Sequence, residues 1–522
     1  MNKNLIAMMI ATIVVTGCMS TGEGAGDTVM AASERGLNTE TLLANNTKPF
    51  VTGSKIAEGD TQALKEQLLN LKDGDELVIP QGKYSDLGQF DINANNVIIK
   101  AEQAGTAWFT GLVQINLRGN NITLDGVVFT EGGPAERMGG IIFRGNDNQL
   151  VNSTFYYFND KYTYEPDDRR SEYPKYLWIA MYGKNNQLID NTFEGKHKRG
   201  TLIGIQKASG DETADHHMIK GNLFYNQKHN QFNEFDIADA KRYNSNSWEA
   251  IRVGDSKSSI YPSKTTIEGN LFLQSDGETE LVSLKSAGNA IRGNTFIDNA
   301  SMISLRHGVN NTVENNVILG NSKRFSGGIR LYDEGHVIRN NYIERVMGTG
   351  NVRGGIAINT GITDVLAGET LDQDVKGKEL SKQATPYKVL IENNSVIDSR
   401  QNFLYSDKKH RVSLYDNSQV TSVYAGTDIT FRNNISYAGV SNSLALKGND
   451  SVAALVNPVY ENDIYYGSVA GTELPWEGVL YRDPKFVSAE NGLLEASNFD
   501  GGARDLTVLT MKETGATYRI KK

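Results

Sequence analysis

Alternating apolar and polar positions recur along the body of the chain in short blocks that end near an asparagine. The blocks include NNQLIDNTF, TTIEGNLF, AIRGNTF, NNTVENNVI and VIRNNYI. Within each block every second residue tends to be apolar, which is the period of a β-strand, and polar turns separate the short segments. The pattern therefore predicts an all-β fold built from one repeated unit.

The spacing of the asparagines indicates the size of that unit. They lie 22, 24 or 25 residues apart at their closest, and 48 or 53 residues apart where loops are inserted. One such unit cannot bury its own apolar face, whereas stacked units can, and stacked asparagines can hydrogen-bond along the column. We expect a right-handed parallel β-helix, because the repeats are too short for the blades of a β-propeller. The predicted asparagine column consists of Asn152, Asn191, Asn222, Asn270, Asn294, Asn316, Asn341, Asn394 and Asn434.

Two segments predict how the coil begins and ends. TQALKEQLLNLKDGDE, residues 61–76, is typical of an amphipathic helix, and we expect it to cap the exposed edge of the first coil. Beyond about residue 440 the repeat weakens. We therefore expect the β-helix over residues 46–440, and irregular last coils with a C-terminal cap over residues 441–522.

The first residues have the features of an export signal. Lys3 precedes an apolar run, residues 5–15, which is too short for a stable membrane span. The chain's only cysteine, Cys18, follows in VTGC, which resembles a bacterial lipoprotein cleavage box; the alternative is a plain secretory signal. We expect a lipoprotein signal over residues 1–18 and a flexible tether over residues 19–45.

This interpretation predicts an exported lipoprotein of a Gram-negative bacterium. The protein would reside in the outer membrane or the periplasm and touch a membrane only through a lipid on Cys18. Ser20 favours the outer membrane, because an acidic residue at that position is linked to retention in the inner membrane.

Charge narrows the class of ligand. The net charge is −9, which argues against a nucleic-acid-binding protein. Glu278 and Glu280 nevertheless stand two residues apart, where a strand would place both carboxylates on one face. Like charges so close need a positive partner, either a bound cation or an ion network with Arg306 and Arg330.

A stripe of cationic residues follows at the repeat spacing. Arg306 lies 21 residues after Lys285, Arg330 lies 24 further on, and Arg353 another 23. The preceding coil supplies NSNSWEAIRVG, which contains Asn246, Glu249 and Arg252. Two carboxylates and the Asn246 amide oxygen form an oxygen-rich set that suits Ca²⁺ better than Zn²⁺ or Mg²⁺. Because Lys285 is five residues from Glu280, a corner between them must reset the strand alternation.

Five blocks together closely resemble polysaccharide lyase family 6, the family of alginate lyases and the dermatan-sulfate lyase chondroitinase B. The resemblance extends from about residue 50 to 400 and implies a right-handed parallel β-helix. NSNSWEAIRVG departs from the glycine-rich run expected there, so its serine and tryptophan would reshape the calcium loop. The matching blocks are WIAMYGKNNQLIDNTFEGK, WEAIRVG, DGETELVSLKS, SLRHG and GGIRLYDEGHVIRNNYIE.

The resemblance also implies roles for individual residues. Asn246, Glu278 and Glu280 fall where the family holds calcium, Lys285 on the Brønsted base and Arg306 on the proposed acid. His307, Arg330 and Arg353 match positions that contact substrate. Arg330 in GGIR favours alginate over dermatan sulfate.

The chemistry implied is β-elimination from a uronate in an acidic polysaccharide. A cation on the uronate carboxylate would stabilise the carbanion. A lysine base must be neutral, a state that nearby cations favour. An arginine is a poor proton donor, so Arg306 would stabilise the leaving oxygen, and His307 is an alternative donor. Lys196 in KHKR is either a second uronate contact or part of a solvated basic loop.

Two hypotheses from other classes stay open. A glycoside hydrolase would use Asp276, Glu278 and Glu280 as acid and base, which would leave Lys285 and Arg306 without a role. A non-catalytic surface protein would use the cationic stripe only to bind acidic glycans. The sequence does not predict the oligomeric state.

Overall fold

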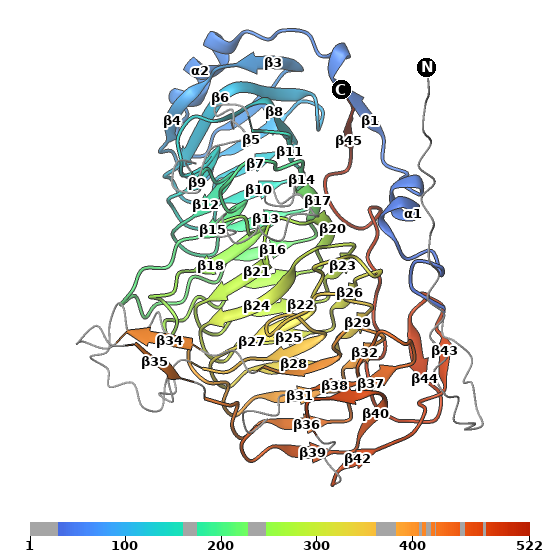
Figure 1. Ribbon diagram of the computed structural model, residues 1–522. Coiled ribbons are helices and arrows are strands. Elements are labelled where there is room, and N and C mark those ends of the chain that lie inside the picture. The colour runs from blue at the N-terminus through green and yellow to red at the C-terminus, as the bar shows by residue number, and fades with distance from the viewer. Residues whose placement is uncertain are drawn as a thin grey trace, which may run out of the picture.

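The computed structural model describes residues 30–159, 175–227, 247–361, 383–406, 410–413, 419–422, 424–448, 455–472 and 477–521. Short parallel strands stack into three long faces that wind around one axis, the predicted right-handed parallel β-helix (Figure 1). Each coil contributes one strand to each face, so residues one coil apart become neighbours.

The strands divide among the faces as follows. Face one contains β2 (Glu76–Ile79), β5 (Ile98–Ala101), β7 (Thr123–Asp125), β10 (Gln149–Val151), β13 (Gln187–Ile189), β16 (Met218–Lys220), β19 (Thr266–Glu268), β22 (Ala290–Arg292), β25 (Thr312–Glu314), β28 (Val337–Arg339), β31 (Leu390–Glu392), β36 (Thr430–Arg432) and β39 (Val459–Glu461). Face two contains β3 (Gly82–Ser85), the first half of β6 (Ala107–Leu117), β8 (Val127–Pro134), β11 (Thr154–Tyr156), β14 (Thr192–Glu194), β17 (Leu223–Gln227), β20 (Leu271–Ser275), β23 (Thr295–Ile297), β26 (Val317–Leu319), β29 (Tyr342–Glu344), β32 (Ser395–Ile397), β37 (Ile435–Ala438), β40 (Asp463–Gly467) and β42 (Val479–Leu480). Face three contains β4 (Gly88–Ile92), the second half of β6, β9 (Ile141–Phe143), β12 (Ile179–Met181), β15 (Ile203–Ile205), β18 (Ile251–Gly254), β21 (Glu280–Lys285), β24 (Met302–His307), β27 (Ile329–Leu331), β30 (Ile356–Ile358), β33 (Phe403–Tyr405), β38 (Leu446–Lys447) and β41 (Val469–Ala470).

Few elements lie outside the three faces. Two antiparallel hairpins pair β34 (His410–Ser413) with β35 (Gln419–Ser422) and β43 (Phe486–Ser488) with β44 (Leu494–Ala496). In the described part of the chain, the helices are α1 (Thr39–Ala44), α2 (Thr61–Leu69) and the 3-10 turn η1 (Gly53–Lys55). No helix among the described residues is long and apolar enough to cross a membrane.

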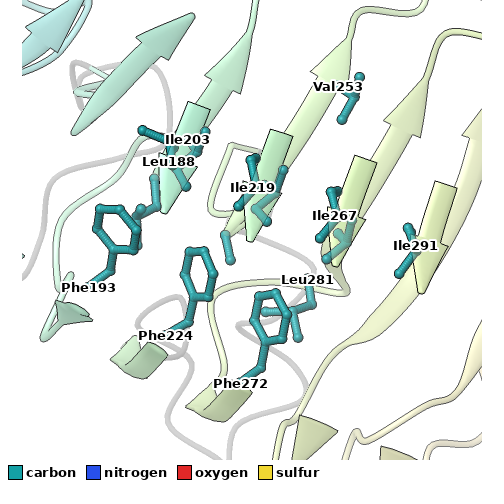
Figure 2. Close-up of a cluster of buried hydrophobic side chains, with 14 of the residues drawn as sticks. Leu188, Phe193, Ile203, Ile219, Phe224, Val253, Ile267, Phe272, Leu281 and Ile291 are labelled. Atoms are coloured by element: carbon teal, nitrogen blue, oxygen red, sulfur yellow. The ribbon is translucent and has the colours of Figure 1, made fainter. Parts of the chain in front are cut away.

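The core is a set of columns of identical or similar apolar side chains. Phe193, Phe224 and Phe272 stack with ring centroids 5.1 and 4.5 Å apart, and columns of isoleucine face them from face one (Figure 2). The parallel register places equivalent residues directly above one another, so each coil buries its apolar residues on those of its neighbours. Each fully buried side chain of this size contributes about 1.5–3 kcal/mol.

The asparagine column is present, with one correction. From Asn191 to Asn434, each side-chain oxygen accepts hydrogen bonds from the backbone of the preceding coil, and Asp463 ends the series. Ser153, not Asn152, occupies the equivalent place one coil before Asn191. Asn152 lies outside the column at φ 47°, because the phenylalanines of the two coils align only when Ser153 is matched with Asn191.

The predicted capping helix is confirmed. α2 begins after Asp60, whose side chain accepts from the Ala63 amide, and it packs Leu64 and Leu68 onto the first coil. It ends at Leu69, with Asn70 as its C-cap, before the end of the predicted segment, and Gly74 at φ 87° then turns the chain toward β2. The unpaired edge of the first coil is thereby partly covered.

The tether prediction is wrong for residues 30–45. This N-terminal arm lies against the solenoid: the Ala32 amide donates to Glu344, Arg35 forms an ion pair with the same carboxylate at 2.5 Å, and Leu42 is buried. Residues 1–29, which include the predicted lipoprotein signal, lie outside the described part of the chain.

The last coils predicted beyond residue 440 are present. Regular coils continue to β42, so the β-helix extends to residue 480. The last segment is not a cap but a strap, residues 486–521, that returns along face two to the first coils, where β45 (Arg519–Lys521) pairs with β1 (Phe50–Thr52) (Figure 1). Backbone bonds to side chains of Ser395, Thr295 and Thr192 trace its path.

Candidate active site

The predicted functional residues gather on face three, on the strands of adjacent coils. Glu280 begins β21 and Lys285 ends it, Arg306 and His307 end β24, and Arg330 is in the middle of β27. The register places Ser283, Ser304 and Arg330 in one column. Residues that are far apart in sequence are therefore brought together by parallel stacking.

A bulge, not a corner, resets the alternation between Glu280 and Lys285. β21 pairs continuously with β24, but the register shifts between Glu280 and Val282 and again between Leu284 and Lys285. Leu281 and Val282 consequently both point into the core. The second shift places Lys285 opposite His307, so Arg306 is not the direct register partner of Lys285 as its spacing predicted.

Three buried carboxylates meet beside β21. One oxygen from each of Glu249, Glu278 and Glu280 lies within 4.8 Å of the others. Thr201 donates to Glu249 at 2.7 Å, and the Trp248 amide donates to Glu278 at 3.2 Å. Gly277 permits this approach, because a Cβ there would lie 2.0 Å from the Trp248 carbonyl oxygen.

The three carboxylates are not electrostatically equivalent. Burial, followed by the neighbouring charges of Glu249 and Glu280, raises the pKa of Glu278 well above its ordinary value. Burial also acts against the charged form of Glu280, but Arg330 foremost, then Arg306 and Lys285, outweigh it and lower the pKa of Glu280. Ionisation of Glu278 is therefore opposed unless a further positive charge binds beside it.

The set of donors fits a hard divalent cation. Three carboxylates converge, they are buried, and the charge on Glu278 lacks a cationic side-chain hydrogen-bond partner among the described residues. Such a pocket of oxygen ligands can bind a metal ion. Asn246, the predicted amide ligand, lies outside the described residues. Glu249, from the same sequence block, belongs to the acidic cluster, a placement that the sequence did not predict.

The cationic side chains surround Glu280. Arg330 donates to the Glu280 Oε1 and to Ser304 Oγ, and Arg306 Nη1 lies 3.2 Å from the same Oε1. Ser283 donates to Oε2 at 2.5 Å. The sequence allows two positive partners for the paired glutamates: a bound cation or an ion network with Arg306 and Arg330. The ion network is present at Glu280, but it does not extend to Glu278.

Lys285 is placed between the carboxylates and solvent. Its Nζ lies 3.7 Å from Glu249 Oε1, and 19% of its side chain is exposed. The amine therefore points outward from face three toward the acidic cluster, and not into the core. An acidic cluster, an outward amine and a partly exposed Arg306 guanidinium share one surface.

The other predicted substrate contacts vary in placement. His307 is buried beside Lys285 in the register. Arg353 donates to Thr279 at 2.8 Å, next to the paired glutamates, and burial foremost, with the nearby Arg330, lowers the pKa of Arg353 to about 10. Both residues border the same surface as Lys285.

Lys196 disagrees with both of its predicted environments. It is neither in a solvated loop nor displayed toward a glycan: its side chain is 1% exposed, its Nζ donates to the Lys198 carbonyl at 2.6 Å, and burial lowers its pKa to about 7. Lys175, by contrast, is exposed and lies near Arg199, Arg252 and the acidic cluster.

Sequence reasoning missed one residue beside Arg306 altogether. Assigning the Gln383 carboxamide orientation that satisfies both of its polar atoms turns its oxygen toward Arg306, where it accepts from Nε at 3.0 Å and from Nη1 at 3.1 Å. Gln383 is separated from Arg306 by more than three coils' worth of sequence and belongs to no block of the repeat. No pattern in the sequence connects the two residues.

Comparisons with known proteins agree on one family. A family model described as Chondroitinase B matches residues 59–469. A search of curated proteins returned no match.

Two solved structures are similar to this chain over almost its whole length. The complex of alginate lyase AlyF-OU02 with G6 is 51% identical, with a TM-score of 0.84, and the match covers 94% of this chain and 99% of that one. A PL6 alginate lyase in complex with a trisaccharide is 50% identical, with a TM-score of 0.82, and the match covers 92% and 98% of the two chains. The PL6 alginate lyase AlyGC, at 22% identity, a TM-score of 0.68 and coverage of 89% and 58%, shares the fold.

Proposed function

Because this chain belongs to polysaccharide lyase family 6, the family of chondroitinase B, we propose that it cleaves alginate by β-elimination. The two similar structures at about half identity are described as alginate lyases, which supports alginate over dermatan sulfate. The observation that carries the mechanism is the shared surface on which Lys285 and Arg306 both contact the buried acidic cluster.

The reaction removes the proton on the carbon next to the uronate carboxylate. Lys285 Nζ accepts this proton, the electron pair forms the C4–C5 double bond, and the bond from C4 to the glycosidic oxygen breaks. Glu249 orients the amine from 3.7 Å, and the proton moves to Nζ as general-base catalysis requires. Lys285 is therefore assigned as the base.

The departing oxygen carries negative charge as the bond breaks. Arg306, 32% exposed and anchored on Glu280, stabilises that charge and directs a proton from water to the oxygen. His307 and Arg353 border the substrate surface, and Arg330 fixes Glu280. The products are a shortened chain and a new end with an unsaturated uronate.

We assign Ca²⁺ to the acidic cluster, held by Glu249, Glu278 and Glu280, with Asn246 as a further ligand. Calcium prefers carboxylate and amide oxygens and tolerates irregular geometry. When bound, the ion supplies positive charge that stabilises the enolate of the substrate carboxylate.

Ultraviolet absorbance of the unsaturated product tests the proposal. Purified protein incubated with poly-mannuronate, poly-guluronate and dermatan sulfate should generate the absorbance with an alginate block and not with dermatan sulfate. Lys285→Ala should remain folded and lose activity. Cleavage without the absorbance would identify a hydrolase, and binding without cleavage a non-catalytic glycan-binding protein.

We also propose that the protein is exported as a lipoprotein of the outer membrane or periplasm. The VTGC box at Cys18 supports this. Labelling of cells with a radioactive fatty acid should mark the full-length protein, and Cys18→Ala should abolish the label. Label that persists in Cys18→Ala would contradict the anchor.

A further inference from the structure

The guanidinium of Arg306 is held from two sides. Glu280 Oε1 lies 3.2 Å from Nη1, and the Gln383 carboxamide oxygen accepts from Nε at 3.0 Å and from Nη1 at 3.1 Å. Both contacts include Nη1, and the Gln383 contact also includes Nε, which makes it the one that spans an edge of the planar group. Because the five donors of arginine have fixed directions, holding one edge fixes the whole plane.

The opposite edge of the guanidinium is left for another acceptor. Within the described residues no acceptor bonds Nη2 of Arg306, although a third of the side chain remains exposed. Nη2 is thus the nitrogen that a substrate oxygen can reach. Without Gln383, Arg306 would keep only the contact through Nη1 and could rotate about it.

Gln383 is itself anchored to the strand that carries Arg306. The carboxylate of Asp333 accepts from the Gly308 amide, two residues after Arg306, and from the Ala384 amide at 3.1 Å, next to Gln383. The Asp333 amide also donates to the Ala384 carbonyl at 3.2 Å. One buried carboxylate therefore sets the distance between the end of β24 and the segment that presents Gln383.

We propose that Gln383 is a positioning residue that orients Arg306, so that Nη2 meets the oxygen expelled in the elimination. This role rests on the proposed lyase function and extends it. Gln383 touches neither base nor cluster, so its effect should be confined to the bond that breaks at C4.

Steady-state kinetics of two variants provide the first test. Gln383→Met has a similar length and no strong acceptor, whereas Gln383→Glu retains an oxygen at the same place. We expect Gln383→Met to lower kcat about 10- to 100-fold with less than about a twofold change in KM, since acid–base assistance as a whole contributes about 10²–10⁴. Gln383→Glu should restore kcat to within about threefold of the original protein. Gln114→Met, at a buried glutamine far along the same sheet in β6, is the matched control and should leave both constants unchanged.

A leaving-group probe separates positioning from a general structural role. A synthetic uronate carrying 4-nitrophenolate at C4 loses a stable anion, which needs no help from Arg306. On this probe Gln383→Met should approach the rate of the original protein, whereas Lys285→Ala should stay inactive. In an Arg306→Ala background the Gln383 change should have no further effect on alginate.

Each result decides one point. Full alginate activity in Gln383→Met, an equal loss on alginate and on the probe, or a loss that Gln383→Glu does not restore would overturn the role of Gln383. If Gln383→Met does not fold, Asp333→Asn takes its place, because it weakens the contact that anchors the Gln383 segment. A normal kcat in folded Asp333→Asn would then overturn the role of Gln383. Absence of unsaturated product from the original protein would instead overturn the proposed function, and with it this role.

Discussion

Single side chains at the site show opposite responses to burial, because their neighbours differ. Glu278 and Glu280 are both almost fully buried, yet the pKa of Glu278 is raised and that of Glu280 is lowered. Arg330 and Arg306 contact Glu280, whereas Glu278 faces Glu249 and Glu280. The neighbouring side chains, and not the residue type, therefore decide whether the negative charge of a buried carboxylate is balanced.

The raised pKa of Glu278 leads to a prediction with two opposite effects on Tm. In chelator, Glu278→Gln should raise Tm by about 1–2 °C, because it removes a carboxyl group whose ionisation is opposed by burial and by Glu249 and Glu280. Added Ca²⁺ should raise Tm of the original protein but not that of the variant, because a ligand is lost. Differential scanning calorimetry with and without Ca²⁺ measures both, and equal stabilisation by Ca²⁺ in the two proteins would refute the assigned site.

Two buried histidines predict how stability depends on pH. Burial lowers the pKa values of His217 and His336 to about 4. The Nδ1 atom of His336 accepts from the Asn311 amide, and its Nε2 contacts the Tyr332 carbonyl, so a second proton would place two donors face to face. The unfolded chain binds this proton near pH 6.5, so the stabilisation is complete above that pH and falls as the pH decreases toward 4.

The loss of stability at low pH can be measured with a variant of His336. At pH 5 each histidine should cost about 2 kcal/mol relative to pH 7. His336→Asn, which offers an uncharged acceptor, should therefore show a smaller decrease of Tm between pH 7 and pH 5 than the original protein. An identical decrease in both proteins would exclude His336 as a source of acid sensitivity.

At the scale of elements, the corner between faces one and two depends on the asparagine column. Asn316 accepts from the Asn294 amide and donates to the Ile291 carbonyl and to the Asn341 oxygen, and it is fully buried. These bonds satisfy backbone groups that the turn removes from the sheets. The column thus replaces sheet pairing at every turn of the coil.

Removing one member should therefore cost more than one average hydrogen bond. Asn316→Ala leaves several buried donors and acceptors unpaired, and we expect a loss of about 2–4 kcal/mol in the free energy of unfolding, measured by urea denaturation. The adjacent Asn315 is exposed at φ 58°, so Asn315→Gly is the matched control and should change stability by less than about 0.5 kcal/mol. Equal effects at the two positions would contradict the role of the column.

At the scale of the whole molecule, the N-terminal arm and the C-terminal strap cover face two. The outer surface of face two carries apolar residues such as Leu271, Val317 and Tyr342, which the N-terminal arm and the strap bury. Near the first coils, Arg519 of the strap forms a buried ion pair with Glu194 at 2.7 Å. The candidate site lies on face three, away from the path of the strap.

Loss of this ion pair should release the end of the strap. Arg519→Ala leaves Glu194 as an uncompensated buried charge, at a cost of about 3–5 kcal/mol. Hydrogen exchange should become faster at residues 514–521, whereas lyase activity on face three should persist. Lys512→Ala, at an exposed strap residue, should change neither. Unchanged exchange in Arg519→Ala would show that other contacts hold the strap.

The sequence predicted those features that depend on repetition. The period of the asparagines and the alternation of apolar residues indicated a stacked β-coil, and spacing close to one coil placed Lys285, Arg306 and Arg330 on one side. The helix before the first coil was equally visible, since amphipathic spacing is a local property. Such features can be predicted from the sequence alone because each coil repeats the same local pattern of apolar and polar residues.

The tertiary structure decided what does not repeat. A bulge after Glu280 set the direction of Lys285, burial removed Lys196 from the surface, and docking turned residues 30–45 and 486–521 into covers for face two. Gln383 reaches Arg306 only because Asp333 ties an inserted segment back to the coil. Contacts of this kind depend on three-dimensional packing between segments with no common period, so no local pattern in the sequence encodes them.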